Sequence, residues 1–305
     1  MEKEEKIEYA VGGTTTSESY SYWRKVFHRL KKHKLAMGSL YVLLGLIIMV
    51  VFAKPLSFGN NPYTYIKSAP WAARPELAPP GPGHILGLDN MARDAWSRLL
   101  YGGRISLAVG LISSIVGAAV GLFFGLPSGY YGGVIDMLIM RFTDFMLSIP
   151  VLPIMIVLAA VIHGSVFTII FIISLFSWMG VARLVRGEVL SLKEQEFTEA
   201  ARAIGESPLR IMMIHLLPNT MAPVIVAATL AVSGNIIFEA SLSFLGLGVR
   251  QPTPSWGNML NGAQSYMLTA PWLMWWPGIA ILVTTLAFNF LGDGLRDALD
   301  PRLYR

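Results

Sequence analysis

Six long apolar segments constrain this chain more than any other feature of its sequence. Each approaches the roughly 20 residues that a helix needs to cross about 30 Å of hydrocarbon. They span residues 35–53, 105–126, 145–162, 166–181, 222–245 and 272–291. Charged residues make up only 14% of the chain, whereas an average soluble domain has about 25%. Since a lipid-exposed segment must satisfy its own backbone hydrogen bonds, the sequence predicts an all-α membrane protein with six transmembrane helices.

The distribution of Lys and Arg predicts the orientation of these helices. Cations cluster before the first apolar segment, between residues 183 and 210, and in the C-terminal tail. Six crossings place all three clusters on one side, and short cytoplasmic loops carry the excess of positive charge. We therefore expect cytoplasmic N- and C-termini. The net charge of +5 then reflects topology and attraction to anionic membrane lipids, and no aromatic-interleaved basic patch indicates a nucleic acid partner.

The expected domains follow this topology. They are a cytoplasmic arm at 1–34, a first transmembrane helix at 35–53, an extracytoplasmic loop at 54–104, a transmembrane core at 105–292 and a cytoplasmic tail at 293–305. Within the arm, apolar residues recur at helical spacing among cations from residue 22 onward, which is typical of a helix lying on the inner leaflet. The chain has no cysteine, which excludes disulfides and thiolate metal sites.

A polar stretch at 191–219 interrupts the apolar segments. Ser191 and Glu194 have the spacing of a capping box, so a first helix is predicted to start there and to run to residue 204. Gly205 can adopt the left-handed conformation that closes a helix. The first helix is therefore expected to end in a tight turn.

Ser207 and Pro208 predict that a second helix follows at once, with Ser207 as N-cap and Pro208 in the first helical position. This helix is expected to end near residue 216, because Pro218 would stop it. The stretch is thus predicted to form two helices joined by an elbow that faces the cytosol.

One face of the first helix is suited to docking. Phe197, Ala200, Ala201 and Ile204 are predicted to lie close to one another, and alanines let another backbone approach closely. A plainer interpretation is a surface helix that rests on lipid headgroups or on the chain's own spans. The residue pattern alone leaves both interpretations open.

The stretch "EAARAIGESPLRIMMIHLLPN" resembles the EAA loop of membrane subunits of ABC importers. The residues that match the pattern of that loop are Glu199, Ala200, Ala201, Gly205, Leu217 and Pro218. His215 stands where the general pattern has Ile, and His-x-Leu-Pro-Asn resembles the version found in the dipeptide and oligopeptide branch.

Three further stretches resemble the same branch. They are "HILGLDNMARDAWSRLLYGGRISL" from residue 84, "GYYGGVIDMLIMRFTD" from residue 129 and "EASLSFLGLGVRQPTPSWGNML" from residue 239. The chain thus resembles the C-type permease subunit of a peptide/nickel ABC importer. Leu88 replaces Thr and Ala92 replaces Gly in the first signature, and the branch includes importers of nickel and of oligosaccharides, so these substrates stay open beside peptides.

The resemblance implies a type I ABC importer permease fold with a cytosolic coupling helix, in a prokaryotic plasma membrane. It implies as partners a second, related permease subunit in a heterodimer, one or two cytosolic ATPase subunits and an extracytoplasmic substrate-binding protein. The coupling loop at 191–219 would engage the ATPase through the matched residues together with Ser207 and Pro208. The chain itself has no Gly-Lys dipeptide and hence no phosphate-binding GxxxxGK[ST] loop, so ATP and magnesium are expected in the partner subunits and no cofactor on this chain.

Two polar residues at membrane depth are candidates for the translocation path or a gate. Glu239 is predicted near the outer end of the fifth segment, and Asn235 lies one turn earlier. The alternative for both is a structural hydrogen bond to a neighbouring helix. Two other functions stay open, namely a proton-coupled secondary transporter that uses Glu239 or Asp144, and a membrane scaffold without transport. No catalytic constellation and no metal site is predicted.

Overall fold

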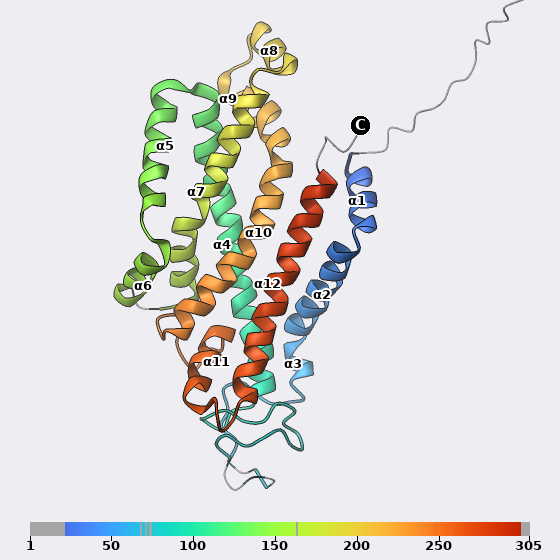
Figure 1. The fold of residues 1–305 in the computed structure, drawn as a ribbon, viewed down its shortest axis with the longest axis vertical. Helices are drawn as coiled ribbons and strands as arrows, with labels where there is room; N and C mark the ends of the chain where they lie inside the picture. The colour runs from blue at the N-terminus through green and yellow to red at the C-terminus, as the bar shows by residue number, and fades with distance from the viewer. Residues whose placement is uncertain (1–21, 68, 71, 73–74, 163, 300–305) are drawn as a thin grey trace, which may run out of the picture.

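The computed structural model describes residues 22–67, 69, 70, 72, 75–162 and 164–299. Most of the arm and the last residues of the tail lie outside the described residues, as does His163. In the described part the chain forms helices joined by loops, with β-pairing limited to isolated bridges near residues 81–94 (Figure 1). The helices are α1 Tyr22–Lys32, α2 Lys34–Val51, α3 Ala53–Leu56, α4 Ala95–Tyr131, α5 Gly133–Ser148, α6 Val151–Val161, α7 Val166–Leu192, α8 Glu196–Ala203, α9 Pro208–Arg210, the π-helix η1 Ile211–Leu216, α10 Leu217–Phe244, α11 Trp256–Ala263, the short 3-10 helix η2 Gln264–Tyr266 and α12 Trp272–Leu299.

The length and composition of the helices agree with six crossings. Five helices are long and apolar enough to span a membrane, namely α2, α4, α7, Pro208–Phe244 and α12. The pair α5 and α6, which is bent by 83°, makes the number six when it is counted as one span. Ile149 and Pro150 lie at the bend, because the residue before a proline is driven out of the helical region.

The third crossing differs from the predicted one, which began at residue 145. The helix α5 starts at Gly133 and carries Asp136 and Asp144. Because of these charges, the prediction did not include residues 133–144 in an apolar segment. Both acids are paired with α7: Asp136 accepts hydrogen bonds from Arg186 at 2.5 and 2.6 Å, and Asp144 forms an ion pair with Arg183. Pairing across helices lets these charges lie in an apolar bundle.

The loop between α3 and α4 is shorter than the predicted 54–104. The helix α4 already begins at Ala95, where the Asp94 carboxylate caps it by accepting the Ser97 backbone N–H at 2.7 Å. Two arginines of the predicted loop have partners inside the protein. Arg98 is buried beside Asp89, and Arg104 donates to the Val50 and Val51 carbonyls.

A row of glycines brings α4 against α7. Gly117, Gly121, Gly125 and Gly129 repeat every fourth residue on α4 and are all buried. A Cβ on any of them would approach α7 atoms to within 2.2–2.7 Å, chiefly those of Ser177, Val181, Val185 and Val189. Because lipid is as apolar as the side chains, helices in membranes associate through such close packing.

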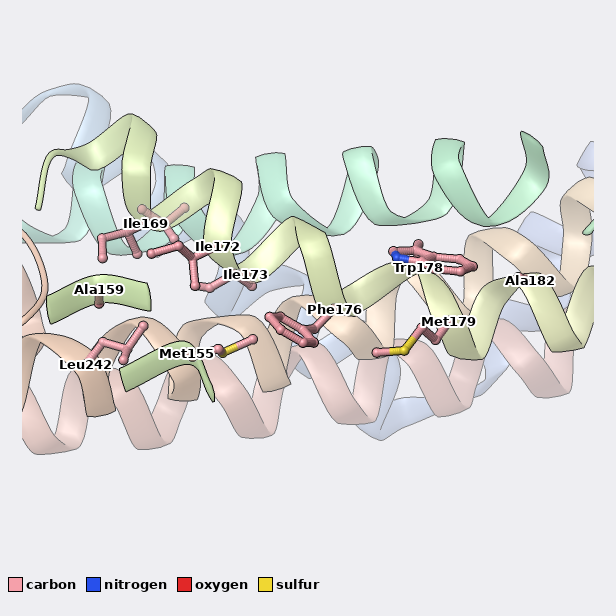
Figure 2. Packing of buried hydrophobic residues seen from close by; sticks show 11 residues of the cluster. Met155, Ala159, Ile169, Ile172, Ile173, Phe176, Trp178, Met179, Ala182 and Leu242 are labelled. Atoms are coloured by element: carbon pink, nitrogen blue, oxygen red, sulfur yellow. The ribbon is translucent and has the colours of Figure 1, made fainter. Parts of the chain in front are cut away.

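The other side of α7 packs onto the bent pair and α10. Figure 2 shows Ile169, Ile172 and Phe176 directed toward Met155 and Ala159 of α6 and Leu242 of α10. All six side chains are buried. The helix α7 therefore lies at the centre of the bundle.

The bundle has two distinct ends (Figure 1). We call the "elbow end" the one that carries α1, α8, α9 and the last turn of α12. The "loop end" carries the 57–94 loop, α6 and α11. The polar stretch at 191–219 thus lies at the elbow end, and the loop that follows the first apolar segment lies at the loop end.

We predict that Gly121→Ala destabilises the protein. The new Cβ would lie 2.6 Å from the Val181 Cβ and 3.0 Å from the Trp178 carbonyl oxygen, so α4 and α7 must separate. The expected loss in the free energy of unfolding is about 1–3 kcal/mol, seen as a lower Tm in detergent. Gly180→Ala on α7 is the control, since its Cβ would meet nothing within 4 Å. Equal Tm values for the two variants would contradict the role given to the glycine row.

Candidate functional site

The polar stretch folds as two helices at the elbow end, with a different start from the predicted one. Ser191 belongs to the last turn of α7, which runs to Leu192, so the capping box of Ser191 and Glu194 is wrong. Instead, α8 begins at Glu196, and the Thr198 hydroxyl donates to the Leu192 carbonyl at 2.9 Å. This bond ties α8 to the end of α7, a contact that helix periodicity could not reveal.

The turn of the elbow matches the prediction. Gly205 has φ +81°, the left-handed region in which an L side chain is strained. The Glu206 N–H donates to the Ala201 carbonyl at 3.1 Å and thereby closes α8. Ser207 caps the next helix by accepting the Arg210 N–H at 3.4 Å, and Pro208 is its first residue. The local turn chemistry is thus confirmed.

The second helix does not stop at Pro218. The segment from Pro208 to Phe244 is continuous, with the π-helix η1 in its first part and Pro218 in the first turn of α10. In η1 the Leu217 N–H donates to the Met212 carbonyl, five residues back. The wider π turn accommodates the proline ring and its missing N–H. The elbow is therefore the direct end of a long membrane-spanning helix.

The two faces of the elbow have different surroundings. Ile204 and Leu209 are 77% and 67% exposed, and Phe197 and Ala200 are exposed with them. Ala201, by contrast, is only 4% exposed and packs into the chain's own core, so its predicted place on the docking face is wrong. The exposed apolar face fits docking, and the interpretation in which α8 rests on the chain's own spans holds for the inner face only.

The remaining predicted residues of the stretch lie around this face. Glu199 and Pro218 are exposed, and Leu217 is half-buried. Arg202 is exposed and lies over the Tyr130 ring, with its guanidinium carbon 5.5 Å from the ring centroid. Sequence reasoning missed the side-chain pair of Glu206 and His215, which joins the turn to η1. His215 stood out only as a departure from the general EAA pattern.

Glu239 lies inside the chain and has protein partners on both carboxylate oxygens. The Ser106 hydroxyl of α4 donates to Oε2 at 2.8 Å, and the Ser243 hydroxyl donates to Oε1 at 2.7 Å. The Ser106 oxygen also accepts the Trp256 N–H at 3.2 Å. Glu239 is fully buried, so it joins α4, α10 and the start of α11 and does not face a path along the chain surface.

Asn235 is also buried, and its side-chain amide nitrogen has no hydrogen-bond partner among the described residues. Because Asn235 is buried, its position does not support the prediction that it lines a translocation path. The structural alternative therefore accounts for Glu239, whereas for Asn235 both interpretations stay open.

A second polar cluster, which the sequence did not predict, lies at the loop end. Arg93 donates to Asp89 at 2.8 Å through Nε, and Arg98 lies 3.3 Å from the same carboxylate. Both arginines also donate to the Gln251 side-chain oxygen. This cluster joins the 57–94 loop to the segment before α11. Within the described part of the chain, no group of three or more His, Asp or Glu side chains is placed to hold a metal ion.

Comparison with known proteins identifies the class to which this architecture belongs. Residues 121–305 match the family of binding-protein-dependent transport system inner membrane components. The chain belongs to this family. Residues 21–80 of the permease also match the N-terminal transmembrane domain of oligopeptide transport permease C. The protein is thus a multi-pass transport subunit of the inner membrane and an ABC importer permease of the C type.

Curated relatives resemble the permease along nearly its full length. It is 40% identical to the dipeptide transport system permease protein DppC of Alkalihalophilus pseudofirmus, over 93% of this chain and 91% of that one. It is 41% identical to the oligopeptide transport system permease protein OppC of Haemophilus influenzae, over 93% and 90%. It is also 41% identical to the glutathione transport system permease protein GsiD of Escherichia coli, over 92% and 91%.

A solved structure supports the fold. A chain of the MetNI methionine ABC transporter, crystallised in an inward-facing conformation, aligns with a TM-score of 0.54. It is 22% identical and covers 66% of this permease and 96% of the MetNI chain. The likeness shows the type I importer fold.

We predict that Glu239→Ala loosens the loop end of the permease. The substitution leaves the Ser106 and Ser243 hydroxyls without their acceptor in a buried site, which is expected to lower the free energy of unfolding by about 1–3 kcal/mol. Ser241→Ala is the control, because that hydroxyl bonds only the Ile237 carbonyl of its own helix. Thermal unfolding in detergent measures both. A Glu239→Ala variant as stable as Ser241→Ala would refute the structural role of this carboxylate.

Proposed function

We propose that the permease forms half of the translocation path of an ATP-driven importer of short peptides. The relatives that support this substrate class are permeases of dipeptide, oligopeptide and glutathione systems, each about as similar to this chain as the others. Oligosaccharide and nickel transport are the alternatives within the same type of importer. The other half of the path is a second, related permease chain in a heterodimer.

The exposed apolar face of the elbow carries the proposal of ATP-driven coupling. Ile204, Leu209 and Phe197 belong to the elbow, and their side chains are exposed in the isolated permease. An exposed apolar patch rimmed by polar residues marks an interaction site. A cytosolic ATPase subunit that receives this face in a cleft would bury it, with Glu199 and Arg202 at its border fixing the register.

The same end is assigned to the cytosol. The helix α1, the elbow and the last turn of α12 lie together there, and they carry the Lys and Arg clusters of the sequence. Positive charge favours the cytoplasmic side. The N- and C-termini are then cytoplasmic, α1 lies at the inner leaflet, and the 57–94 loop faces the extracytoplasmic binding protein.

The mechanism follows from the continuity of the elbow with α10. ATP and magnesium are held by the ATPase subunits, whose closure displaces the docked elbow. Because Pro208–Phe244 is one helix, this displacement acts at the end of a span and tilts it. Nucleotide thereby shifts the population between two packed arrangements of the permease pair, through its different affinity for each.

Replacing Gly205 tests the coupling. In Gly205→Glu the left-handed backbone is strained and a charge enters the elbow, so peptide-stimulated ATP hydrolysis by the assembled importer should fall by about tenfold or more. Membrane insertion and abundance should be unchanged. Gly59→Glu is the matched control, since Gly59 also has φ +81° and open space but lies in the 57–94 loop, at the opposite end of the bundle. Normal stimulation in Gly205→Glu would count against ATPase docking at the elbow.

The substrate class is tested by uptake into proteoliposomes that contain the assembled importer and its binding protein. Labelled Ala-Ala and Ala-Ala-Ala are expected to accumulate with internal ATP, and accumulation should survive collapse of the proton gradient by an ionophore. Labelled nickel ions and maltotriose are the comparison substrates. Uptake of either of these in place of the peptides would overturn the peptide assignment, and uptake that needs the proton gradient without ATP would indicate a secondary transporter.

A further inference from the structure

One side-chain pair ties the turn of the elbow to the helix that follows it. His215 Nε2 lies 2.9 Å from Glu206 Oε2, although the two residues are nine positions apart. Glu206 directly follows Gly205, the left-handed residue after α8, whereas His215 lies in η1 at the root of α10. The contact therefore joins the turn to the long helix.

Both side chains of this pair face the permease itself. The Glu206 and His215 side chains are 18% and 30% exposed, whereas Ile204 and Leu209 beside them are mostly exposed. The pair is thus separate from the apolar docking face. Arg210 approaches the other carboxylate oxygen of Glu206 at 3.7 Å, from a position that is 64% exposed.

The backbone of His215 is anchored as well. The Asn219 side-chain amide donates to the His215 carbonyl at 2.6 Å, one residue after Pro218, which has no N–H to give to the helix. The π turn η1 thus presents His215 from a fixed backbone. Such π turns are frequent at functional sites because they redirect a side chain without ending the helix.

The elbow is held by two kinds of contact. Before Gly205, Thr198 bonds the end of α7, and Ala201 packs into a core that includes Val185 of α7 and Ile211 and Leu216 of η1. After Gly205, whose backbone is unrestricted by a side chain, the Glu206–His215 pair ties the turn to η1. The apolar core thus holds α8, and the pair holds the turn that follows it.

We propose that Glu206 and His215 are positioning residues that form a latch between the elbow and α10. The latch fixes the turn that follows Gly205 to the root of α10, beside the apolar contact of Ala201 with η1, so that a displacement of the docked elbow reaches the membrane-spanning helix. This inference rests on the proposed docking of an ATPase at the elbow. It assigns to His215, which replaces Ile in the general EAA pattern, a specific mechanical role.

The latch is tested in the assembled importer with Glu206→Ala, His215→Ala and the double variant. Each single variant should lower Ala-Ala-Ala-stimulated ATP hydrolysis and uptake by about fivefold. The ATPase subunits should copurify in wild-type amounts, because the docking face is intact. The double variant should lose no more than either single variant, since both remove one interaction. His215→Gln, whose amide can donate to the carboxylate, should recover activity to within about twofold of wild type.

Arg210→Gln is the matched control, because it removes the second cation from the same carboxylate and leaves the Glu206–His215 contact in place. It should keep stimulation within about twofold of wild type, as exposed ion pairs contribute little. Backbone amide hydrogen exchange over residues 206–212 gives an independent measure of the latch. Exchange there should be faster in Glu206→Ala and His215→Ala than in Arg210→Gln and wild type.

Several results would overturn the latch. Wild-type stimulation in both alanine variants would do so, as would additive losses in the double variant or an equal loss in Arg210→Gln. Loss of ATPase copurification would show that the two residues are docking contacts instead. Gly205→Glu separates this failure from that of the proposed function: if it abolishes stimulation while the alanine variants keep it, docking stands and the latch falls. If Gly205→Glu is also normal, the docking itself is wrong.

Discussion

The close contact between α4 and α7 is the interaction on which the rest of this permease depends. In lipid there is little hydrophobic force between helices, so two helices stay together only where their surfaces approach closely. The glycine row on α4 provides this approach along four successive turns. Since α7 leads into the elbow and α4 leads out of the loop end, this pair sets the positions of both polar regions of the chain.

The contact between α4 and α7 also explains how charges are tolerated at membrane depth. A central charge in a bilayer is expensive, so it must meet a partner from another helix. Asp136 on α5 meets Arg186 on α7, and Glu239 on α10 meets Ser106 on α4. Each partner lies on one of the two central helices. Glu239, which the sequence marked as a candidate for the translocation path, is in this way held inside the bundle.

The elbow is therefore a stronger candidate for function than the polar residues inside the bundle. Its inner face belongs to the core of the permease, and its outer face leaves Ile204 and Leu209 exposed. A segment with one face in the core and the other face free for a partner can transmit a displacement and stay attached to the permease. The continuity of α9, η1 and α10 gives that displacement a direct route into the membrane.

Several features of this protein followed from its sequence alone, because they depend on short-range physics. The membrane class and the number of crossings follow from the need of each apolar segment to satisfy its own backbone in lipid. The turn at Gly205, Ser207 and Pro208 follows from the conformations that these three residues allow. The EAA resemblance added the family, which the comparisons support.

Only the tertiary structure decided the features that depend on partners far away in the chain. The loop after the first span ends earlier than predicted, where Arg98 pairs with Asp89. The segment before Pro218 forms a π-helix that continues into α10. Ala201 points inward because α7 supplies a core for it. Glu239 is structural because Ser106, 133 residues earlier, reaches its carboxylate. Periodicity and propensity describe one helix at a time, whereas burial and pairing are properties of the assembled bundle.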